Sequence, residues 1–221
     1  MIVHPRQDMG REAVPLWVID EAHPAPQTLV DGAAALSFAP DSGGFYPGVR
    51  AETSGDYANW LEATIAGLAD FGVVNILRAT FAVTTSDPAA LAPIQRIPHF
   101  DGPEGDVFAT VHYLCAPPHR GTGFFRHVRT GFERITAARS PLWRQALSED
   151  RAQYGLPEGQ YHEGDRHGFE PTGYADCAYN RLIVYPANCL HSGDIGDSWR
   201  AGDLGEARLT VTSLVRTITA L

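Results

Sequence analysis

Hydrophobic and β-branched residues along this chain come mostly in short runs separated by residues that favour turns. Short runs of this kind are typical of strands, whereas apolar residues that recur every three or four positions are typical of a helix. Helical spacing predicts a helix over 57–70, capped by Asp56 and ended by Gly72. It also predicts two short helices within 131–154, separated at Pro141. The predicted strands are 14–20, 73–85 (as one strand or two), 106–114, 181–185 and 207–218.

Turn-forming composition predicts mostly irregular structure over 31–55 and a loop over 155–174. Many short strands in a chain of this length favour a double-sheet jelly roll of the cupin kind. The prediction is therefore a mainly β protein with flanking helices, a double-stranded β-helix in a single domain. Its expected parts within 1–221 are amino-terminal strands and a support helix (1–95), metal-site strands (96–124 and 179–218) and a helical and loop insert (125–178).

Composition and charge disfavour some classes of function. The formal net charge of −9 disfavours sequence-independent binding to nucleic acid, which requires a basic surface. All 17 basic residues are arginine, so a buried anion would be bound by a guanidinium group. The sequence shows no signal peptide and no apolar run long enough for a membrane span, which predicts a cytoplasmic protein without a membrane partner. Cys115, Cys177 and Cys189 show no paired spacing and are predicted to be buried free thiols.

Candidate metal chemistry begins at His99 and Asp101. In an extended segment alternate residues face the same way, so these two side chains project to one side and could bind a single cation. His191, which lies 191 − 101 = 90 residues beyond Asp101, is the third predicted ligand. Two histidines and one carboxylate form the facial triad typical of non-haem Fe(II), with three coordination positions left open.

Several ordered motifs resemble those of the 2-oxoglutarate/Fe(II)-dependent dioxygenases, particularly the prolyl-hydroxylase-like branch. They are the Pro-His-Phe-Asp run at 98–101, the strand 108–114, the Gly-Thr-Gly turn at 121–123 and the Leu-His-Ser-Gly segment at 190–193. The resemblance covers about 96–125 and 181–212. It implies a dioxygenase that binds Fe(II) through the predicted triad and uses 2-oxoglutarate as cosubstrate. The implied substrate is a small molecule or a peptidyl side chain.

The resemblance also implies residues that bind the cosubstrate. Arg208 matches the arginine that anchors the distal carboxylate of 2-oxoglutarate, Thr212 would assist it, and Tyr113 matches a position that hydrogen-bonds the cosubstrate. Arg208 follows His191 by 208 − 191 = 17 residues, a longer gap than is usual in that family. The segment 194–206 is therefore expected to bulge as a loop.

Other interpretations of the same residues stay open. Arg200 and Arg216 are alternative anchors for the cosubstrate. A jelly roll could also bind a ligand or a partner without catalysis, or use the same ligands for Zn(II)-dependent hydrolysis. Hydrolysis would need a positioned general base, for which Glu104 is a loosely placed candidate.

The remaining histidines have simpler interpretations. His112 is expected to have a cross-strand or surface role, and His119 and His127 to lie near the mouth of the pocket. The segment 161–167 contains two histidines and two acidic residues, but their spacing differs from that of the helical zinc motif. A solvated loop near the substrate is therefore favoured over a second metal site.

Overall fold

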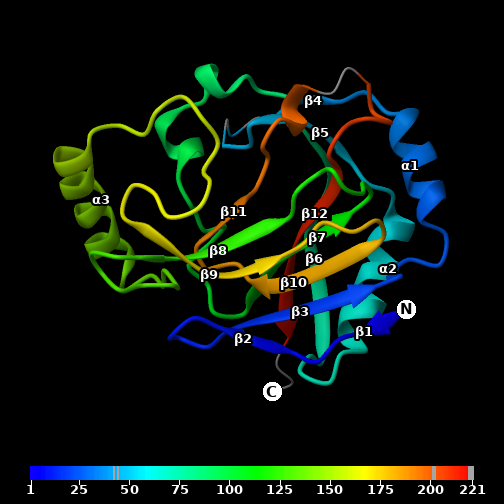
Figure 1. Ribbon diagram of the computed structural model, residues 1–221. Coiled ribbons are helices and arrows are strands. Elements are labelled where there is room, and N and C mark those ends of the chain that lie inside the picture. Colours follow the sequence, from blue (N-terminus) through cyan, green and yellow to red (C-terminus); the bar gives the residue numbers. More distant parts are fainter. Residues whose placement is uncertain (42, 44, 201–202, 219–221) are drawn as a thin grey trace.

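The computed structural model describes residues 1–41, 43, 45–200 and 203–218 (Figure 1). Three α-helices occur in this part of the chain: α1 (Pro26–Ala34), α2 (Gly55–Ala66) and α3 (Ser140–Tyr154). Short 3-10 turns lie at Pro88–Ala90, Pro93–Arg96 and Ser198–Arg200. The strands are β1 (Ile2–Val3), β2 (Gln7–Met9), β3 (Val14–Asp20), β4 (Ala39–Pro40), β5 (Gly48–Glu52), β6 (Val73–Thr84), β7 (Val107–Tyr113), β8 (Thr122–His127), β9 (Phe169–Ala175), β10 (Arg181–Pro186), β11 (His191–Gly193) and β12 (Leu209–Ile218).

The described strands form two antiparallel sheets. The larger sheet has the order β1-β3-β10-β7-β12-β6-β5-β4, with β2 paired to β3, and the smaller sheet has the order β11-β8-β9. Figure 1 shows the smaller sheet lying in front of the middle of the larger one. The protein is thus a mainly β, cupin-like jelly roll in a single domain, which confirms the predicted fold class.

Apolar side chains fill two layers on either side of the larger sheet. Behind it, Tyr57, Leu61 and Ile65 of α2 pack against the sheet and are buried. Between the two sheets, Phe124 of β8 packs edge-on against Tyr185 of β10, with ring centroids 5.1 Å apart. Because both faces of the larger sheet are covered, its central strands are fixed in register and can hold polar side chains at defined positions.

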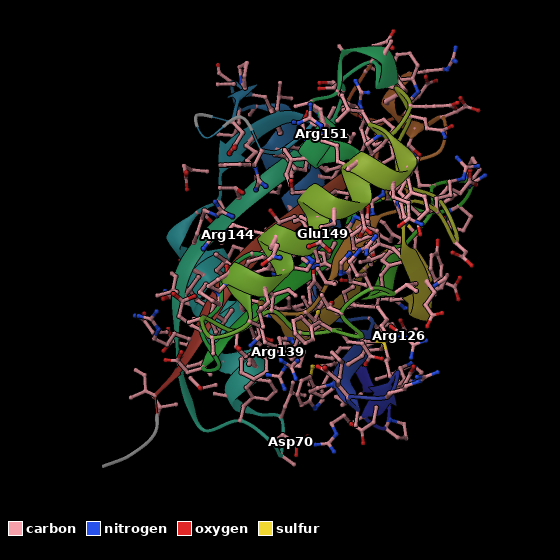
Figure 2. The ribbon with its side chains drawn as sticks, turned by 90° about the vertical axis from the view of Figure 1, so that its left-hand side faces the viewer. Asp70, Arg126, Arg139, Arg144, Glu149 and Arg151 are labelled. Atoms are coloured by element: carbon pink, nitrogen blue, oxygen red, sulfur yellow. The ribbon has the colours of Figure 1, made fainter. Side chains whose placement is uncertain are left out.

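Helix α3 packs beside one end of the smaller sheet (Figure 1). Its Trp143 is buried in a cluster with Phe125 and Phe169 of β8 and β9. Figure 2 shows the helix running diagonally across this side of the molecule, with Arg144 and Glu149 among its labelled side chains, and both residues are exposed. The helix is therefore amphipathic, with its apolar side against the sheet.

The first predicted helix has different ends in the structure. Helix α2 begins at Gly55 because Ser54, in an extended conformation, accepts a hydrogen bond from the Tyr57 backbone N–H at 3.3 Å. Asp56 therefore lies inside the first turn and is not the cap, and the helix ends at Ala66 rather than at 70. Both residue types cap helices well, so composition alone did not distinguish them.

Three other predictions of local structure were wrong. The segment 131–154 contains one helix, α3, rather than two. Pro141 does not break it because it lies in the first turn, where a backbone N–H has no hydrogen-bond partner within the helix. The stretch 31–55 is more regular than predicted, since it contains β4, β5 and the end of α1. The predicted loop 155–174 contains most of β9, whose polar, proline-containing sequence gives no clear strand signal.

The expected insert 125–178 contributes to the fold as well as to its surface. It contains the second half of β8 and all of β9, and both strands belong to the smaller sheet. Residues 219–221 of the predicted domain, and 201–202 of the predicted loop 194–206, lie outside the described residues. None of the described helices has the length and apolar character needed to cross a membrane.

Candidate metal centre

The three predicted metal ligands meet at one place between the sheets. One potential ligand atom from each of His99, Asp101 and His191 lies within 4.8 Å of the others. Nε2 of His191 is 3.5 Å from Oδ2 of Asp101, and the two imidazole rings have centroids 4.5 Å apart. No other group of three such side chains is found among the described residues.

Backbone hydrogen bonds fix the positions of these side chains. The His99 N–H donates to the His191 carbonyl at 2.9 Å, and the His191 N–H donates to the His99 carbonyl at 2.8 Å. The Asp101 N–H donates at 2.8 Å to the carbonyl of Ala187, the residue directly after β10. Three candidate ligands from two distant segments are thus held in place by main-chain contacts.

The protonation states suit metal binding. Burial among protein atoms and, to a smaller extent, the nearby His191 lower the pKa of His99 to about 4, although the ring itself is open to the cavity. His99 is therefore neutral at pH 7. Nδ1 of His191 lies 3.1 Å from the Cys189 carbonyl, a contact that requires Nδ1 to carry the proton and leaves the Nε2 lone pair free. Two imidazoles and one carboxylate fit a divalent transition metal.

A cavity of about 710 Å³ opens beside the three ligands. Its wall includes apolar and aromatic side chains, among them Val111, Trp143 and Tyr185. A pocket of this size suits a cosubstrate together with part of a small molecule or a side chain. The apolar part of the wall limits the access of water to the ligands.

Arg208 lines the same cavity, immediately before β12, and is only 5% exposed. Its Nε donates to the Arg120 carbonyl at 3.0 Å and its Nη2 to the Gly121 carbonyl at 2.9 Å. None of the described carboxylates forms an ion pair with it. Burying a charge without a counter-ion is unfavourable, so this guanidinium fits the anionic end of a ligand.

The other predicted cosubstrate residues have partners within the protein. Thr212 lines the cavity, but its hydroxyl accepts a hydrogen bond from Arg50 Nη1 at 2.7 Å rather than contacting Arg208. The Tyr113 ring lies 5.5 Å from the Arg208 guanidinium, whereas its hydroxyl is 2.7 Å from Thr122 Oγ1. Thr122 lines the cavity and Tyr113 does not, so Tyr113 contacts the site through its neighbours.

The alternative residues lie elsewhere. Arg216 pairs with Asp106 at 3.3 Å and Arg200 pairs with Asp197 at 3.1 Å, both on the exposed surface. Glu104, the candidate base for hydrolysis, is also exposed. The cavity wall includes none of these three residues.

Arg50, a second arginine of the cavity wall, was not predicted from the sequence. It lies on β5, within the stretch expected to be irregular, and its Nη1 donates to Thr80 Oγ1 at 2.8 Å as well as to Thr212. No local motif marks this residue. Only the pairing of β5 with β6 brings it beside β12.

The remaining histidines are more buried than expected. His112 is fully buried, with Nδ1 3.3 Å from the Tyr57 hydroxyl and Nε2 3.0 Å from Asn180 Oδ1, so a surface role is excluded. His127 is also fully buried and lies 2.6 Å from Asp150 Oδ2 of α3, away from the cavity. Both rings have structural roles that alternation along a strand did not reveal.

The cysteines are free and buried, as predicted. Cys115 and Cys177 lie side by side, with 3.6 Å between their sulfur atoms. Burial raises the pKa of Cys189 well above its ordinary value, so this thiol is protonated at pH 7. None of the three lines the cavity.

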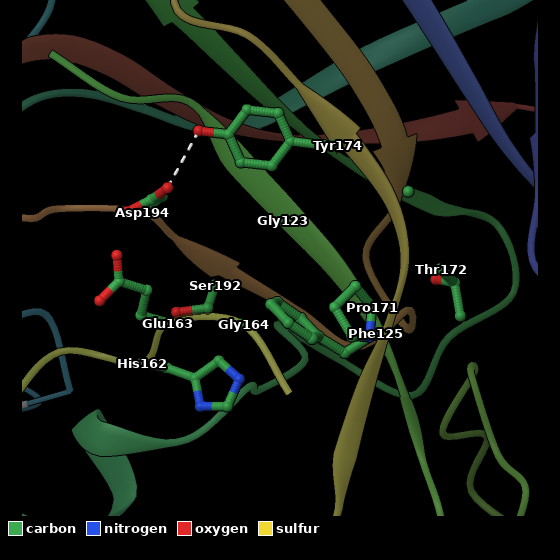
Figure 3. A pocket seen from close by; sticks show the side chains of 11 residues that line it. Gly123, Phe125, His162, Glu163, Gly164, Pro171, Thr172, Tyr174, Ser192 and Asp194 are labelled. Atoms are coloured by element: carbon green, nitrogen blue, oxygen red, sulfur yellow. Dashed lines mark hydrogen bonds between the residues drawn. The ribbon is translucent and has the colours of Figure 1, made fainter. Parts of the chain in front are cut away.

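A second pocket of about 500 Å³ lies beside the smaller sheet (Figure 3). Its wall includes His162 and Glu163, and the Tyr174 hydroxyl there donates to Asp194 at 3.1 Å. His162 is 4% exposed and packs edge-on against Phe125, so the segment 161–167 is not a wholly solvated loop. Among the described residues, this segment contains no group of three side chains that could hold a metal ion.

A family model matches nearly the whole chain. This model, described as a family of unknown function (DUF6445), covers residues 3–215. The chain belongs to the DUF6445 family. A comparison with curated proteins found no match.

Solved structures extend the fold assignment of this DUF6445 protein. HygX from Streptomyces hygroscopicus with nickel and 2-oxoglutarate bound is 10% identical, with 93% of this chain and 84% of that chain covered and a TM-score of 0.51. The non-heme alpha ketoglutarate dependent epimerase SnoN from nogalamycin biosynthesis is 12% identical, with 92% and 79% covered and a TM-score of 0.52. AviO1 from Streptomyces viridochromogenes is 12% identical, with 94% and 92% covered and a TM-score of 0.51. At this identity the likeness shows a shared fold.

Proposed function

We propose that the protein is an Fe(II)- and 2-oxoglutarate-dependent oxygenase that oxidises a small molecule or a peptidyl side chain. The observation that carries the proposal is the meeting of His99, Asp101 and His191 in one cavity with Arg208, a buried cation that has no carboxylate partner among the described residues. The solved structures of HygX with nickel and 2-oxoglutarate and of the alpha ketoglutarate dependent SnoN support it by analogy of fold.

In this proposal each residue has a defined task. His99, Asp101 and His191 would hold Fe(II) from one side and leave three positions open. Bound Fe(II), with 2-oxoglutarate and dioxygen, supplies the oxidation of C–H bonds, in which the keto acid becomes succinate and carbon dioxide. Arg208 would bind the distal carboxylate of 2-oxoglutarate through its unused Nη1. No side chain has to act as a nucleophile.

The other predicted residues have supporting tasks. Thr122, which hydrogen-bonds to Tyr113, is available on the cavity wall for the cosubstrate, so Tyr113 would act by holding Thr122 in place. Thr212 would orient Arg50 rather than Arg208. The proposed assignment to the prolyl-hydroxylase-like branch rests on the sequence motifs alone.

The hydrolase alternative has less support. Zn(II)-dependent hydrolysis needs a positioned base that activates water. Apart from Asp101, the carboxylate on the described cavity wall belongs to Asp41, which lies 3.4 Å from Arg50, whereas Glu104 is exposed outside the cavity. The oxygenase needs no such base.

The proposal is tested by measuring succinate formed from 2-oxoglutarate in the presence of Fe(II), ascorbate and dioxygen. We expect slow succinate formation even without added substrate, because such cosubstrate turnover can proceed uncoupled. The same assay with Zn(II), and with the His191→Ala variant and Fe(II), should give none. Absence of succinate from wild-type protein that holds a full equivalent of Fe(II) would contradict the proposal.

A further inference from the structure

Arg50 is held rigidly beside the metal centre. Its Nη1 donates to the hydroxyls of Thr80 and Thr212, at 2.8 and 2.7 Å. Its guanidinium carbon lies 4.2 Å from the centre of the Tyr46 ring, in a stacked cation–π arrangement. Three contacts, from two strands and the loop before β5, thus orient one flexible side chain, so little conformational entropy remains to be lost when a ligand binds.

One edge of this guanidinium forms an ion pair but no hydrogen bond among the described residues. Nε of Arg50 is buried and has no hydrogen-bond partner among the described residues. The carboxylate of Asp41 is 3.4 Å away, longer than the roughly 2.7–2.9 Å of a charge-assisted hydrogen bond. A buried donor without an acceptor is unfavourable because it has lost its hydrogen bonds to water. An acceptor from a ligand in the cavity would remove this cost.

The charges of the cavity also favour an anion. The described wall carries the cations of Arg50, Arg78 and Arg208 and the anions of Asp41 and Asp101, which gives a net charge of 3 − 2 = +1. Fe(II) would add two positive charges and the 2-oxoglutarate dianion would remove two. The filled cavity therefore keeps one excess positive charge, and a single anionic group would neutralise it.

The cosubstrate does not account for both arginines. A chelating keto acid that binds the metal at one end has one free carboxylate, and Arg208 is the buried arginine without a carboxylate partner. Arg50 contacts Thr212, four residues further along β12, or about 13 Å at the rise of a strand. We propose that Arg50 binds a carboxylate of the primary substrate and so selects anionic substrates. This inference rests on the proposed oxygenase function.

The experiment compares two probes of nearly the same shape, 3-phenylpropanoate and 3-phenylpropanamide. Binding is measured by anaerobic calorimetry to protein saturated with Fe(II) and 2-oxoglutarate, so that the metal and Arg208 are already occupied. A charge-assisted hydrogen bond contributes about 1.5–3 kcal/mol, so wild-type protein should bind the carboxylate about 10- to 100-fold more tightly than the amide.

Two variants assign this preference to a residue. Arg50→Met removes the positive charge and the planar set of N–H donors. The ratio of carboxylate affinity to amide affinity should then fall to about one. Arg78→Met removes the same charge from the wall of the same cavity, and the ratio should stay above about fivefold because the oriented donors of Arg50 remain. If Arg50→Met does not fold, Thr212→Val takes its place, and loss of one orienting hydrogen bond should lower the ratio.

Each contrary result has a distinct meaning. Equal binding of the two probes to wild-type protein, no binding of the carboxylate, or an unchanged ratio in Arg50→Met would overturn the inference. So would an equal loss in Arg78→Met, which would assign the preference to the general field of the cavity. If Arg50→Met no longer binds 2-oxoglutarate, Arg50 is the cosubstrate anchor and the inference also fails. Failure of wild-type protein to bind 2-oxoglutarate would instead overturn the proposed function.

Discussion

His99 and His191 are joined by two backbone hydrogen bonds, of 2.9 and 2.8 Å, although 191 − 99 = 92 residues separate them. This short antiparallel contact connects the segment before β7 with the first residue of β11. It places both imidazoles at one end of the cavity. The candidate metal centre is therefore positioned by main-chain pairing between two distant segments.

The first prediction concerns the anchor of the cosubstrate. Arg208→Met should weaken 2-oxoglutarate binding about 10- to 100-fold, because a charge-assisted hydrogen bond contributes about 1.5–3 kcal/mol. Arg216→Met, on the surface beside Asp106, is the matched control and should bind normally. Calorimetric titration of anaerobic Fe(II)-loaded protein measures both. Normal affinity in Arg208→Met would remove this residue from the site.

A second prediction concerns Tyr113. Its hydroxyl bonds to Thr122 and does not line the cavity, so Tyr113→Phe should reduce 2-oxoglutarate affinity less than about fivefold. It should lower the free energy of unfolding by about 1 kcal/mol, since one buried hydrogen bond is lost. Urea unfolding and the same titration separate the two effects. A loss of affinity as large as that of Arg208→Met would show that Tyr113 binds the cosubstrate directly.

The third prediction concerns acid stability. Burial lowers the pKa of His112 from 6.5 to about 4. Between these values the unfolded chain binds a proton that the folded protein excludes, so stability falls as the pH drops from about 6.5 to about 4. His112→Gln, which can still hydrogen-bond to Tyr57 and Asn180, should lose less stability over this range. Urea unfolding at pH 7.5 and pH 5 tests this, and an equal loss in both proteins would contradict it.

A fourth prediction distinguishes two candidate helix caps. Ser54→Ala should lower the free energy of unfolding by about 0.5–2 kcal/mol, because it removes the acceptor for the Tyr57 N–H. Asp56→Ala removes only a favourable charge from the first turn of α2 and should cost about 0.3–1 kcal/mol. Denaturant unfolding compares the two variants. A larger effect at Asp56 would favour the cap that sequence analysis predicted.

Sequence analysis was most successful where apolar residues form long runs. β3, β6, β7, β10 and β12 were all predicted within about two residues of their observed ends, because buried central strands are rich in such residues. β9 was missed because its sequence, Phe-Glu-Pro-Thr-Gly-Tyr-Ala, contains a proline and a glycine, which are unusual inside strands. It nevertheless pairs with β8. β5 was missed because it is short and follows a glycine- and proline-rich stretch.

In the candidate site too, residues were predicted only where the local sequence marks them. His99, Asp101 and His191 could be selected because their residue types and order carry the chemistry. Arg50 could not, since its position beside Thr212 results from the pairing of β5 with β6 and of β6 with β12, across 212 − 50 = 162 residues. Thr212 was expected to assist Arg208 because the two residues lie on the same face of one strand. In the structure its hydroxyl accepts a hydrogen bond from Arg50 instead.

The measurement that tests the central claim most directly is an anaerobic titration of the protein with Fe(II) and 2-oxoglutarate, followed by visible absorption. A keto acid chelated to Fe(II) gives a weak charge-transfer band. We predict that this band appears at one equivalent of metal in wild-type protein, is absent in His99→Ala and requires a higher 2-oxoglutarate concentration in Arg208→Met. A fully metallated wild-type protein without the band, or a His99→Ala variant that keeps it, would contradict the account.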